Sequence, residues 1–253
     1  MKVELIRYTP EALELLIGTK SARMRGKDVN TMSDSEKYDH FKYMLDTIKS
    51  PFEFVDYVFD ISEVSRAFAQ QLTRTRTGAY QMETQRALDM SNSDIVEPTK
   101  FEGDEELHRL FWDAIADTNA SYQQLVAAGA ELQDARSILP MNSATRIQCK
   151  FNLRTLSDIA KTRLCTRTAG EYQRVFRLMR DAVLAIHPWA EPMLQVACIA
   201  TGQCAFPRHG KEFCPFWRPW MDLEKEKEQL REDFWRIEVQ TNNPVAAGGK
   251  STG

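Results

Sequence analysis

Long apolar runs are missing from this sequence. No stretch approaches the ~20 apolar residues that a membrane-spanning helix needs, and residues 1–10 lack the apolar stretch of a secretory signal. We therefore expect a cytoplasmic protein. A strong excess of either charge is also missing, because the formal net charge is -3. This balance excludes a general attraction to nucleic acid or to an anionic membrane, so any basic binding site must be local.

Cysteine and histidine are scarce, with five and four residues. The odd cysteine count and the lack of an export signal indicate reduced thiols rather than disulfides. No pair of cysteine and histidine suggests a nucleophilic site. Residues of zinc-binding type occur at Cys198, Cys204, His209 and Cys214. This run lacks the close C-x2-C pair that makes such patterns specific, so we expect no metal site.

Apolar periodicity predicts both strands and helices. Period-two alternation predicts strands at residues 2–8, 53–61 and 145–151. Helical spacing predicts helices that begin near residue 11 and span 38–48, 64–72, 104–128, 130–139, 153–164 and 172–183, with a loop at 21–36. Ser62 is expected to cap the helix at 64–72. These elements predict an α+β protein in which a mixed sheet packs against long helices.

The C-terminal part differs in composition from the rest. One main domain is expected over residues 1–195, because a chain of this length can bury one substantial core. Residues 196–240 hold several prolines and an aromatic cluster, followed by a predicted charged helix at 222–235. The aromatic cluster consists of Phe213, Phe216, Trp217 and Trp220. Such clusters more often cover a core edge or a subunit interface than bind a ligand. The glycine-rich tail at 241–253 is expected to be disordered.

The segment from Gln71 to Arg86 reads QLTRTRTGAYQMETQR and is unusually polar beside two apolar elements. It holds three arginines, whose planar guanidinium groups match phosphate oxygens. Gly78 would let the backbone approach a ligand closely. This composition suits an anionic nucleotide or a dinucleotide cofactor. A solvated surface loop is the alternative that composition alone leaves open.

The order of residues in this segment resembles the signature of the flavin-dependent thymidylate synthases, Arg-His-Arg-x-x-Ser-x-Asn-x-x-Ser-x-Arg. Arg74, Arg76 and Arg86 occupy its three arginine positions. Four positions differ from the signature: Thr75 replaces the histidine, Ala79 and Thr84 replace the serines, and Gln81 replaces the asparagine.

Other stretches resemble the same family in the same order. Residues 50–53 read SPFE and residues 64–72 read VSRAFAQQL. Further on, residues 135–140 read ARSILP, residues 151–156 read FNLRTL, and Arg163 follows Arg154 by nine positions. The resemblance covers about residues 1–195, and it assigns them to a catalytic domain with the flavin-dependent thymidylate synthase fold.

The resemblance implies an enzyme that carries a one-carbon unit from methylenetetrahydrofolate to C5 of a pyrimidine deoxynucleoside monophosphate, with FAD as cofactor and NADPH as reductant. It implies a homotetramer with active sites between subunits. The residues expected near the flavin are Arg74, Thr75, Arg76, Gln81, Asn152 and Arg154. The residues expected to hold the nucleotide are Gln71, Thr84, Gln85, Arg86, Arg136 and Arg163. Asp158 and Arg163 are expected beside the reacting base.

Departures from the family pattern leave the substrate open. Phe54 and Met82 replace a histidine and a glutamate of the family, and Asp158 replaces an asparagine. A carboxylate only accepts hydrogen bonds and suits the exocyclic amine of cytosine, whereas an amide suits uracil. A synthase that acts on dUMP and a phage hydroxymethylase that acts on dCMP in the host cytoplasm therefore remain equal alternatives.

Two further alternatives stay open. Asp158 could instead form a helix ion pair with Arg154, four residues earlier, which would stabilise a surface helix by about 0.3–0.5 kcal/mol. A nucleotide-binding relative without catalysis is a third function. Retention of all three signature arginines together with Arg136, Arg154 and Arg163 argues against this function, because buried charge without a ligand is costly.

Overall fold

A four-stranded sheet forms the centre of the protein. The computed structural model describes residues 1–24, 26–168, 170–206, 214 and 216. The strands are β1 (Lys2–Tyr8), β2 (Asp56–Ser65), β3 (Ala79–Met82) and β4 (Ala144–Asn152), in the spatial order β1-β2-β4-β3. The α+β class is confirmed. All three strand pairs are antiparallel, where we expected a mixed sheet.

The antiparallel arrangement agrees with burial along the strands. Every second residue of β4 is buried from Thr145 to Phe151, and the residues between them are exposed. Such alternation is typical of an antiparallel sheet with one solvated face, because parallel sheets are usually covered on both faces. The buried face carries Tyr57, Phe59 and Phe151.

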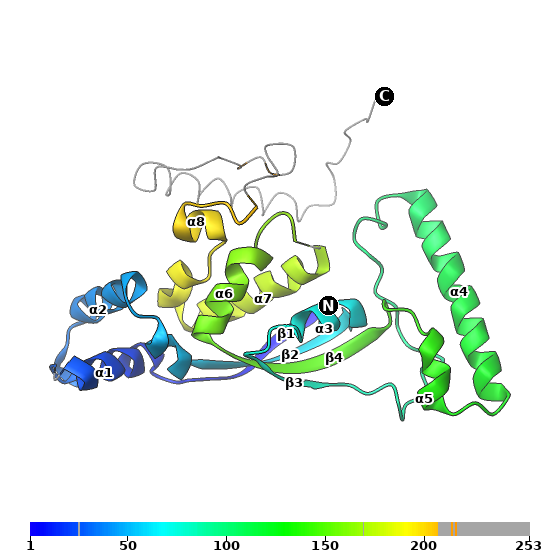
Figure 1. Ribbon diagram of the computed structural model, residues 1–253, viewed down its shortest axis with the longest axis horizontal. Coiled ribbons are helices and arrows are strands. Elements are labelled where there is room, and N and C mark those ends of the chain that lie inside the picture. The colour runs from blue at the N-terminus through cyan, green and yellow to red at the C-terminus, as the bar shows by residue number, and fades with distance from the viewer. Residues whose placement is uncertain (25, 169, 207–213, 215, 217–253) are drawn as a thin grey trace.

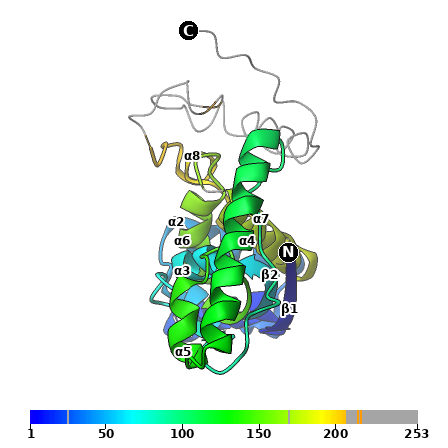
Figure 2. The ribbon, with the colours of Figure 1, turned by 90° about the vertical axis from the view of Figure 1, so that its right-hand side faces the viewer.

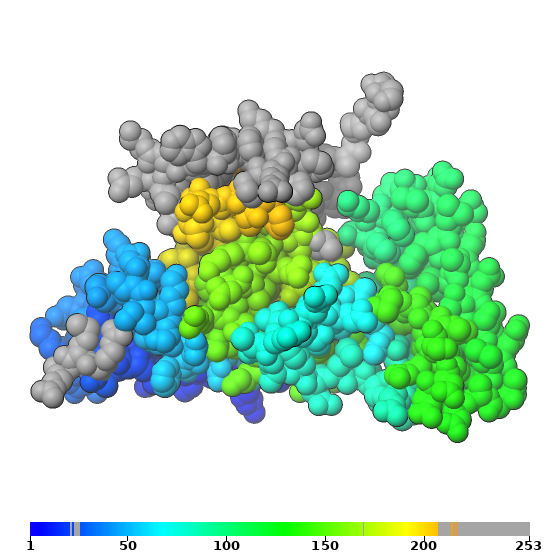
Figure 3. Space-filling model, viewed as in Figure 1, coloured from blue at the N-terminus to red at the C-terminus, as the bar shows by residue number. Residues whose placement is uncertain are grey.

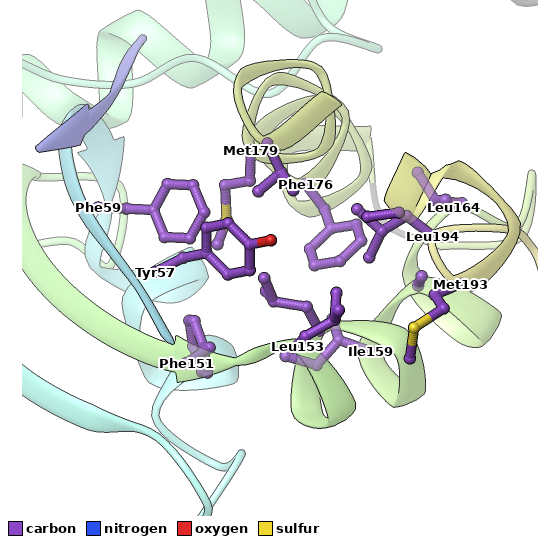
Figure 4. Close-up of a cluster of buried hydrophobic side chains, with 14 of the residues drawn as sticks. Tyr57, Phe59, Phe151, Leu153, Ile159, Leu164, Phe176, Met179, Met193 and Leu194 are labelled. Atoms are coloured by element: carbon purple, nitrogen blue, oxygen red, sulfur yellow. The ribbon is translucent and has the colours of Figure 1, made fainter. Parts of the chain in front are cut away.

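Two helices cover this buried face, α6 (Leu153–Arg163) and α7 (Gly170–Ile186). Figure 4 shows the aromatic side chains of the sheet pointing toward Phe176 and Met179 of α7 and Ile159 of α6. These side chains are at most 7% exposed. Helix α6 packs on this core and carries several of the predicted site residues.

The boundary between β2 and α3 (Arg66–Leu72) lies later than predicted. A bulge between Ile61 and Val64 shifts the pairing of β2 with β4, and Glu63 takes a left-handed φ of 58°. The strand therefore continues to Ser65, which caps α3 by accepting a hydrogen bond from the Phe68 amide at 3.0 Å. The prediction of Ser62 as the cap was wrong, because the bulge hides the continuation of the strand from a period-two pattern.

An N-terminal arm of helices lies at one end of the sheet (Figure 1). It contains α1 (Ala12–Met24), η1 (Val29–Thr31), α2 (Asp34–Asp46) and η2 (Ser50–Phe54). The predicted loop at 21–36 is shorter than expected. Helix α2 begins earlier because Ser33 and Glu36 form a capping box, which lets a polar first turn be helical.

At the other end, α4 (Glu105–Ala127) lies beside α5 (Leu132–Ala135) and η3 (Arg136–Ile138), as Figures 1 and 2 show. The helix predicted at 130–139 is thus divided into two short turns. Figure 3 shows α4 beside the central body, with the surface hollowed between the upper part of α4 and that body. Helix α4 buries Ile115 and Tyr122 but leaves several large apolar side chains exposed.

The described chain ends with η4 (Pro188–Met193) and α8 (Ala197–Thr201). The predicted helix at 222–235 and the tail at 241–253 lie outside the described residues. Among the described helices, none combines the length and the apolar character that crossing a membrane requires.

Candidate active site

The signature segment turns tightly between α3 and β3. The Tyr80 hydroxyl lies 3.0 Å from the Leu72 carbonyl oxygen and 2.6 Å from the Thr75 carbonyl oxygen, which ties the turn to the strand. A Cβ at Gly78 would lie 2.5 Å from both the Phe151 ring and the Tyr80 hydroxyl. Glycine is therefore required at this position by packing within the protein, whereas the sequence suggested close approach to a ligand.

A cavity of about 700 Å³ opens between this turn and α6. Five of the predicted site residues line it: Thr75, Asn152, Arg154, Asp158 and Arg163. The other lining residues are Glu53, Thr77, Thr155, Ile159 and Thr162. The first turn of α6 is fixed at the cavity, because the Asn152 side chain accepts a hydrogen bond from the Thr155 amide at 2.8 Å. The lining is rich in hydroxyl groups and cationic forks, which suit an anionic ligand.

The ion pairs at the cavity are not the pair of Asp158 with Arg154 that we considered as an alternative role for Asp158. Arg154 donates to Glu53 at 2.5 Å, and Asp158 accepts from Lys161 at 2.7 Å. The expected pair of Asp158 with Arg154 is not present. Arg154 pairs with Glu53 instead, because η2 places Glu53 beside the start of α6. Asp158 pairs with Lys161, which lies one turn further along the same helix. The Asp158 side chain is 65% exposed.

Arg163 ends α6 and stacks on a buried tyrosine. Its guanidinium carbon lies 4.2 Å from the centre of the Tyr172 ring. Tyr172 is 2% exposed, and its hydroxyl has no hydrogen-bond partner in the described part of the chain. Burial raises the pKa of this hydroxyl, and the nearby positive charge of Arg163 opposes that effect. The stacking orients Arg163 at the cavity.

A second group of predicted residues lies away from this cavity. Arg86 donates to the Gln133 side chain at 3.4 Å, and Arg136 donates to the Gln133 carbonyl oxygen at 3.0 Å. Gln85 is 7% exposed, and its amide nitrogen has no hydrogen-bond partner among the described residues. Thr84 accepts a hydrogen bond from the Arg86 amide at 3.1 Å. These contacts gather part of the predicted nucleotide site at the α5 end of the protein.

The remaining predicted residues are dispersed. Gln81 and Thr84 line a shallow cavity of about 410 Å³ along β3 and β4. Gln71 lines a third cavity, of about 770 Å³, between α3 and the start of α7. Arg74 and Arg76 are exposed and line none of these three cavities. One copy of the described chain therefore does not bring all predicted residues to one place.

Several residues at these sites were not predicted. Glu53 was noted only as part of a stretch that resembles the family, and its partner Arg154 lies 101 positions away. No pattern in the sequence indicated the stacking of Arg163 on Tyr172. Arg66, which donates a hydrogen bond to the Glu83 carbonyl oxygen at 3.4 Å, falls outside the signature and was missed as well.

The sequence run of Cys198, Cys204, His209 and Cys214 has residues of zinc-binding type. Among the residues that the structure describes, no group of three His, Cys, Asp or Glu side chains could hold a metal ion. His209 lies outside the described residues. The thiol of Cys198 is mostly buried, and burial raises its pKa to about 12, with smaller effects of Cys165, Cys214 and Cys204. Such thiols are protonated at neutral pH and poorly reactive.

The comparison with known structures supports the fold. A crystal structure of the UMP/dUMP methylase PolB from Streptomyces cacaoi, bound with 5-Br dUMP, superimposes with a TM-score of 0.64 at 18% identity. The match covers 76% of this chain and 93% of that protein.

Sequence relatives support the family. The chain is 28% identical over 219 residues to the flavin-dependent thymidylate synthase of Pyrococcus furiosus. The aligned region covers 81% of this chain and 89% of that enzyme. It is 30% identical over 200 residues to the enzyme of the same name from Sulfolobus acidocaldarius, covering 74% of each. The family model for the thymidylate synthase complementing protein matches residues 4–189. The chain therefore belongs to the thymidylate synthase complementing protein family, that of the flavin-dependent thymidylate synthases.

Proposed function

We propose that this protein transfers a one-carbon unit from methylenetetrahydrofolate to C5 of a pyrimidine deoxynucleoside monophosphate, with dUMP converted to dTMP. The family match carries this proposal, together with the convergence of Asn152, Arg154 and Arg163 on one cavity. Flavin-dependent thymidylate synthases are the curated relatives, and the structural relative PolB is a UMP/dUMP methylase.

The residues at the cavity beside α6 fit FAD. Its lining combines Asn152 and Arg154 with the hydroxyl groups of Thr75 and Thr77, a donor set that suits a diphosphate. Arg74 and Arg76 make no ion pair in the described chain and are free to bind the cofactor as the resemblance predicts. Bound FAD supplies the electron chemistry, with NADPH as the source of electrons.

The protein contributes position and charge to the reaction. Glu53 holds Arg154 at the cavity, and Tyr172 holds Arg163. In this proposal Arg163 donates hydrogen bonds to the pyrimidine, while Asp158 borders the place of the reacting base. No described side chain is needed as a nucleophile.

We infer that a complete active site forms between copies of the chain. Arg86 and Arg136 contact Gln133 near α5, whereas Arg154 and Arg163 line the cavity at α6. Helix α4 also exposes Leu107, Leu110 and Leu125 on one face, each by 39–49%. An apolar helix face of this kind favours coverage by another subunit. A homotetramer with shared sites accounts for both observations.

A complementation experiment tests the shared site. Arg154→Ala and Arg136→Ala are each expected to abolish most activity. If the two residues serve one site from different subunits, mixed oligomers that contain both variants regain part of the activity. Mixed oligomers that stay as inactive as the single variants would contradict the shared site.

Hydroxymethylation of dCMP is the second candidate, and Asp158 at the cavity is the observation that favours it. Incubation with FAD, NADPH and methylenetetrahydrofolate against dUMP and dCMP in parallel separates the two by product mass. A colourless protein that cannot be reconstituted with FAD and yields no product would instead indicate a nucleotide-binding relative without catalysis.

A further inference from the structure

Helix α6 ends at Arg163, and no glycine follows to close it. The last carbonyl groups of a helix have no partner within it, so they need donors from elsewhere. Here the side-chain amide of Gln173, in the first turn of α7, donates to the carbonyl oxygens of Leu164 and Cys165 at 3.0 and 2.9 Å. The start of α7 therefore fixes the end of α6, directly beside Arg163.

The residue before Gln173 supports the side chain of Arg163. The guanidinium carbon of Arg163 lies 4.2 Å from the centre of the Tyr172 ring. The ring itself is fixed, since Tyr172 is 2% exposed and meets Phe68 of α3 edge-on, with the ring centres 5.1 Å apart. No carboxylate among the described residues forms an ion pair with Arg163. The stack therefore sets the direction in which the donors of Arg163 point.

A third residue of the same turn holds α3 in place. The Glu171 carboxylate accepts hydrogen bonds from the Ser65 amide, at 2.7 Å, and from the Ser65 hydroxyl. Ser65 is the residue that caps α3 and so fixes Phe68 against Tyr172. Three consecutive side chains of α7 thus bind three neighbouring parts of the chain, and two of them act on the end of α6.

We propose that Tyr172 and Gln173 are positioning residues for Arg163, which keep its donors directed at the pyrimidine. That role of Arg163 rests on the proposed function. A long cationic side chain loses rotamer freedom when it binds a ligand, and a stack that orients it beforehand lowers this cost. Neither positioning residue belongs to the stretches on which the family resemblance rests. The ring of Tyr172 supplies the effect, because its hydroxyl has no hydrogen-bond partner in the described chain.

Calorimetric titration of the FAD-loaded protein tests this assignment, with dUMP and with deoxyribose 5-phosphate, which lacks the base. We expect roughly tenfold weaker dUMP binding in Tyr172→Leu and unchanged binding of deoxyribose 5-phosphate, because a cation–π contact that orients a base-binding group is lost. Tyr172→Phe keeps the ring and should bind dUMP like the wild type. Phe176→Leu is the matched control, since Phe176 is another buried aromatic residue of α7, 1% exposed, that lies in the core.

A double-mutant cycle shows whether Tyr172 acts through Arg163. Arg163→Gln alone should weaken dUMP binding, and adding Tyr172→Leu should then cost nothing further, because the oriented group is already gone. Gln173→Met removes the donors at the end of α6 and should give a smaller loss that Arg163→Gln also abolishes. A residue that serves only the fold would lower the Tm without this dependence on Arg163.

Equal dUMP affinity in Tyr172→Leu and the wild type would overturn the assignment. So would a loss in Tyr172→Leu that persists in full on the Arg163→Gln background, or an equal loss for dUMP and deoxyribose 5-phosphate. If Tyr172→Leu does not fold, Gln173→Met decides by the same comparison, and an unchanged dUMP affinity then overturns the assignment.

Activity separates this assignment from the proposed function. The expected result is a raised KM for the nucleotide in Tyr172→Leu with unchanged FAD occupancy. If the wild type forms product and Tyr172→Leu leaves both KM and kcat unchanged, the positioning role fails and the function stands. If the wild type binds neither dUMP nor dCMP, the function fails. The cycle of Arg163→Gln and Tyr172→Leu is then measured on the free energy of unfolding, where additive effects would overturn the stack as well.

Discussion

Arg154 and Glu53 form an ion pair at 2.5 Å although 101 positions separate them in the chain. Glu53 comes from the turn before β2, and Arg154 comes from the first turn of α6. The pair therefore ties two elements together at the cavity beside α6, which both residues line. It also leaves Asp158 without Arg154 as a partner.

Removal of this pair is expected to affect the cofactor more than the fold. Both side chains are about half exposed, at 46% and 50%, so Glu53→Gln should lower the free energy of unfolding by less than about 1 kcal/mol. Loss of orientation of Arg154 should weaken FAD binding several-fold. Thermal unfolding and FAD titration measure the two effects. A large loss of stability with unchanged FAD affinity would show that the pair serves only the fold.

Arg74 and Arg76 are exposed, and neither forms an ion pair in the described chain. If they bind the flavin, the double change to Ala should strongly reduce FAD occupancy with little effect on the Tm. Arg109→Ala is the matched control, since Arg109 is an exposed arginine that pairs with Asp113 on α4. Flavin absorbance of the purified proteins is the measurement, and full occupancy in the double variant would remove both residues from the cofactor site.

Arg86 and Arg136 are expected to serve the nucleotide and not the flavin. Changing either to Ala should weaken nucleotide binding by roughly tenfold or more, because hydrogen bonds to charged groups are among the stronger ones. FAD should remain bound in both variants. Titration with dUMP and dCMP, followed by flavin absorbance, checks both parts of this prediction. Unchanged nucleotide affinity in both variants would show that the phosphate lies elsewhere.

Much of the fold follows from local patterns in the sequence. The helices around Tyr122, Leu156 and Val175 and the strand around Phe59 have clear periodicity, and each is present. Strand β3 was missed because its four residues are half polar and lie inside the signature segment. Its stability comes from pairing with β4, which is a long-range contact that no local pattern contains.

The site was less predictable than the fold. The family resemblance supplied the residues that now line one cavity, such as Asn152 and Arg154. It did not supply their partners, because the contact of Glu53 with Arg154 and the stacking of Tyr172 on Arg163 depend on tertiary packing. Arg66 carries no signature, and only the fold shows that it binds the Glu83 carbonyl oxygen.

His187 gives a prediction about pH that does not depend on function. It is 7% exposed, its Nδ1 lies 2.9 Å from the Tyr57 hydroxyl, and burial lowers its pKa below the ordinary value of 6.5, partly offset by Glu14. The unfolded chain therefore takes up this proton at a higher pH than the folded chain. Stability from this group is complete above about pH 6.5 and declines as the pH falls below it.

Denaturant unfolding between pH 7.5 and 5 measures this effect. His187→Gln, which can keep a hydrogen bond to Tyr57, should flatten the decline relative to the wild type. His108→Gln is the control, because His108 is exposed and bound to Glu97. A decline of equal slope in the wild type and in His187→Gln would mean that other groups cause the pH dependence.

Asp158 provides the test of the base. It lines the cavity, and its ion pair with Lys161 joins an exposed carboxylate to a half-buried lysine on one helix face. If the substrate is dCMP, the carboxylate accepts a hydrogen bond from the amino group at C4. Asp158→Asn should then shift the ratio of kcat/KM values toward dUMP by roughly tenfold to a hundredfold, because the bound base would cover the exposed side chain and leaving a buried polar group unpaired costs about 1–3 kcal/mol.

Lys161→Gln is the matched control, because it breaks the same ion pair and leaves the carboxylate in place. If Asp158 only pairs with Lys161 on the surface, both variants should leave selectivity unchanged and alter the free energy of unfolding by no more than about half a kcal/mol. The two kcat/KM ratios and the two unfolding curves together distinguish these roles. A ratio that stays at its wild-type value in Asp158→Asn removes the residue-level argument for cytosine, and dUMP is then the better-supported substrate.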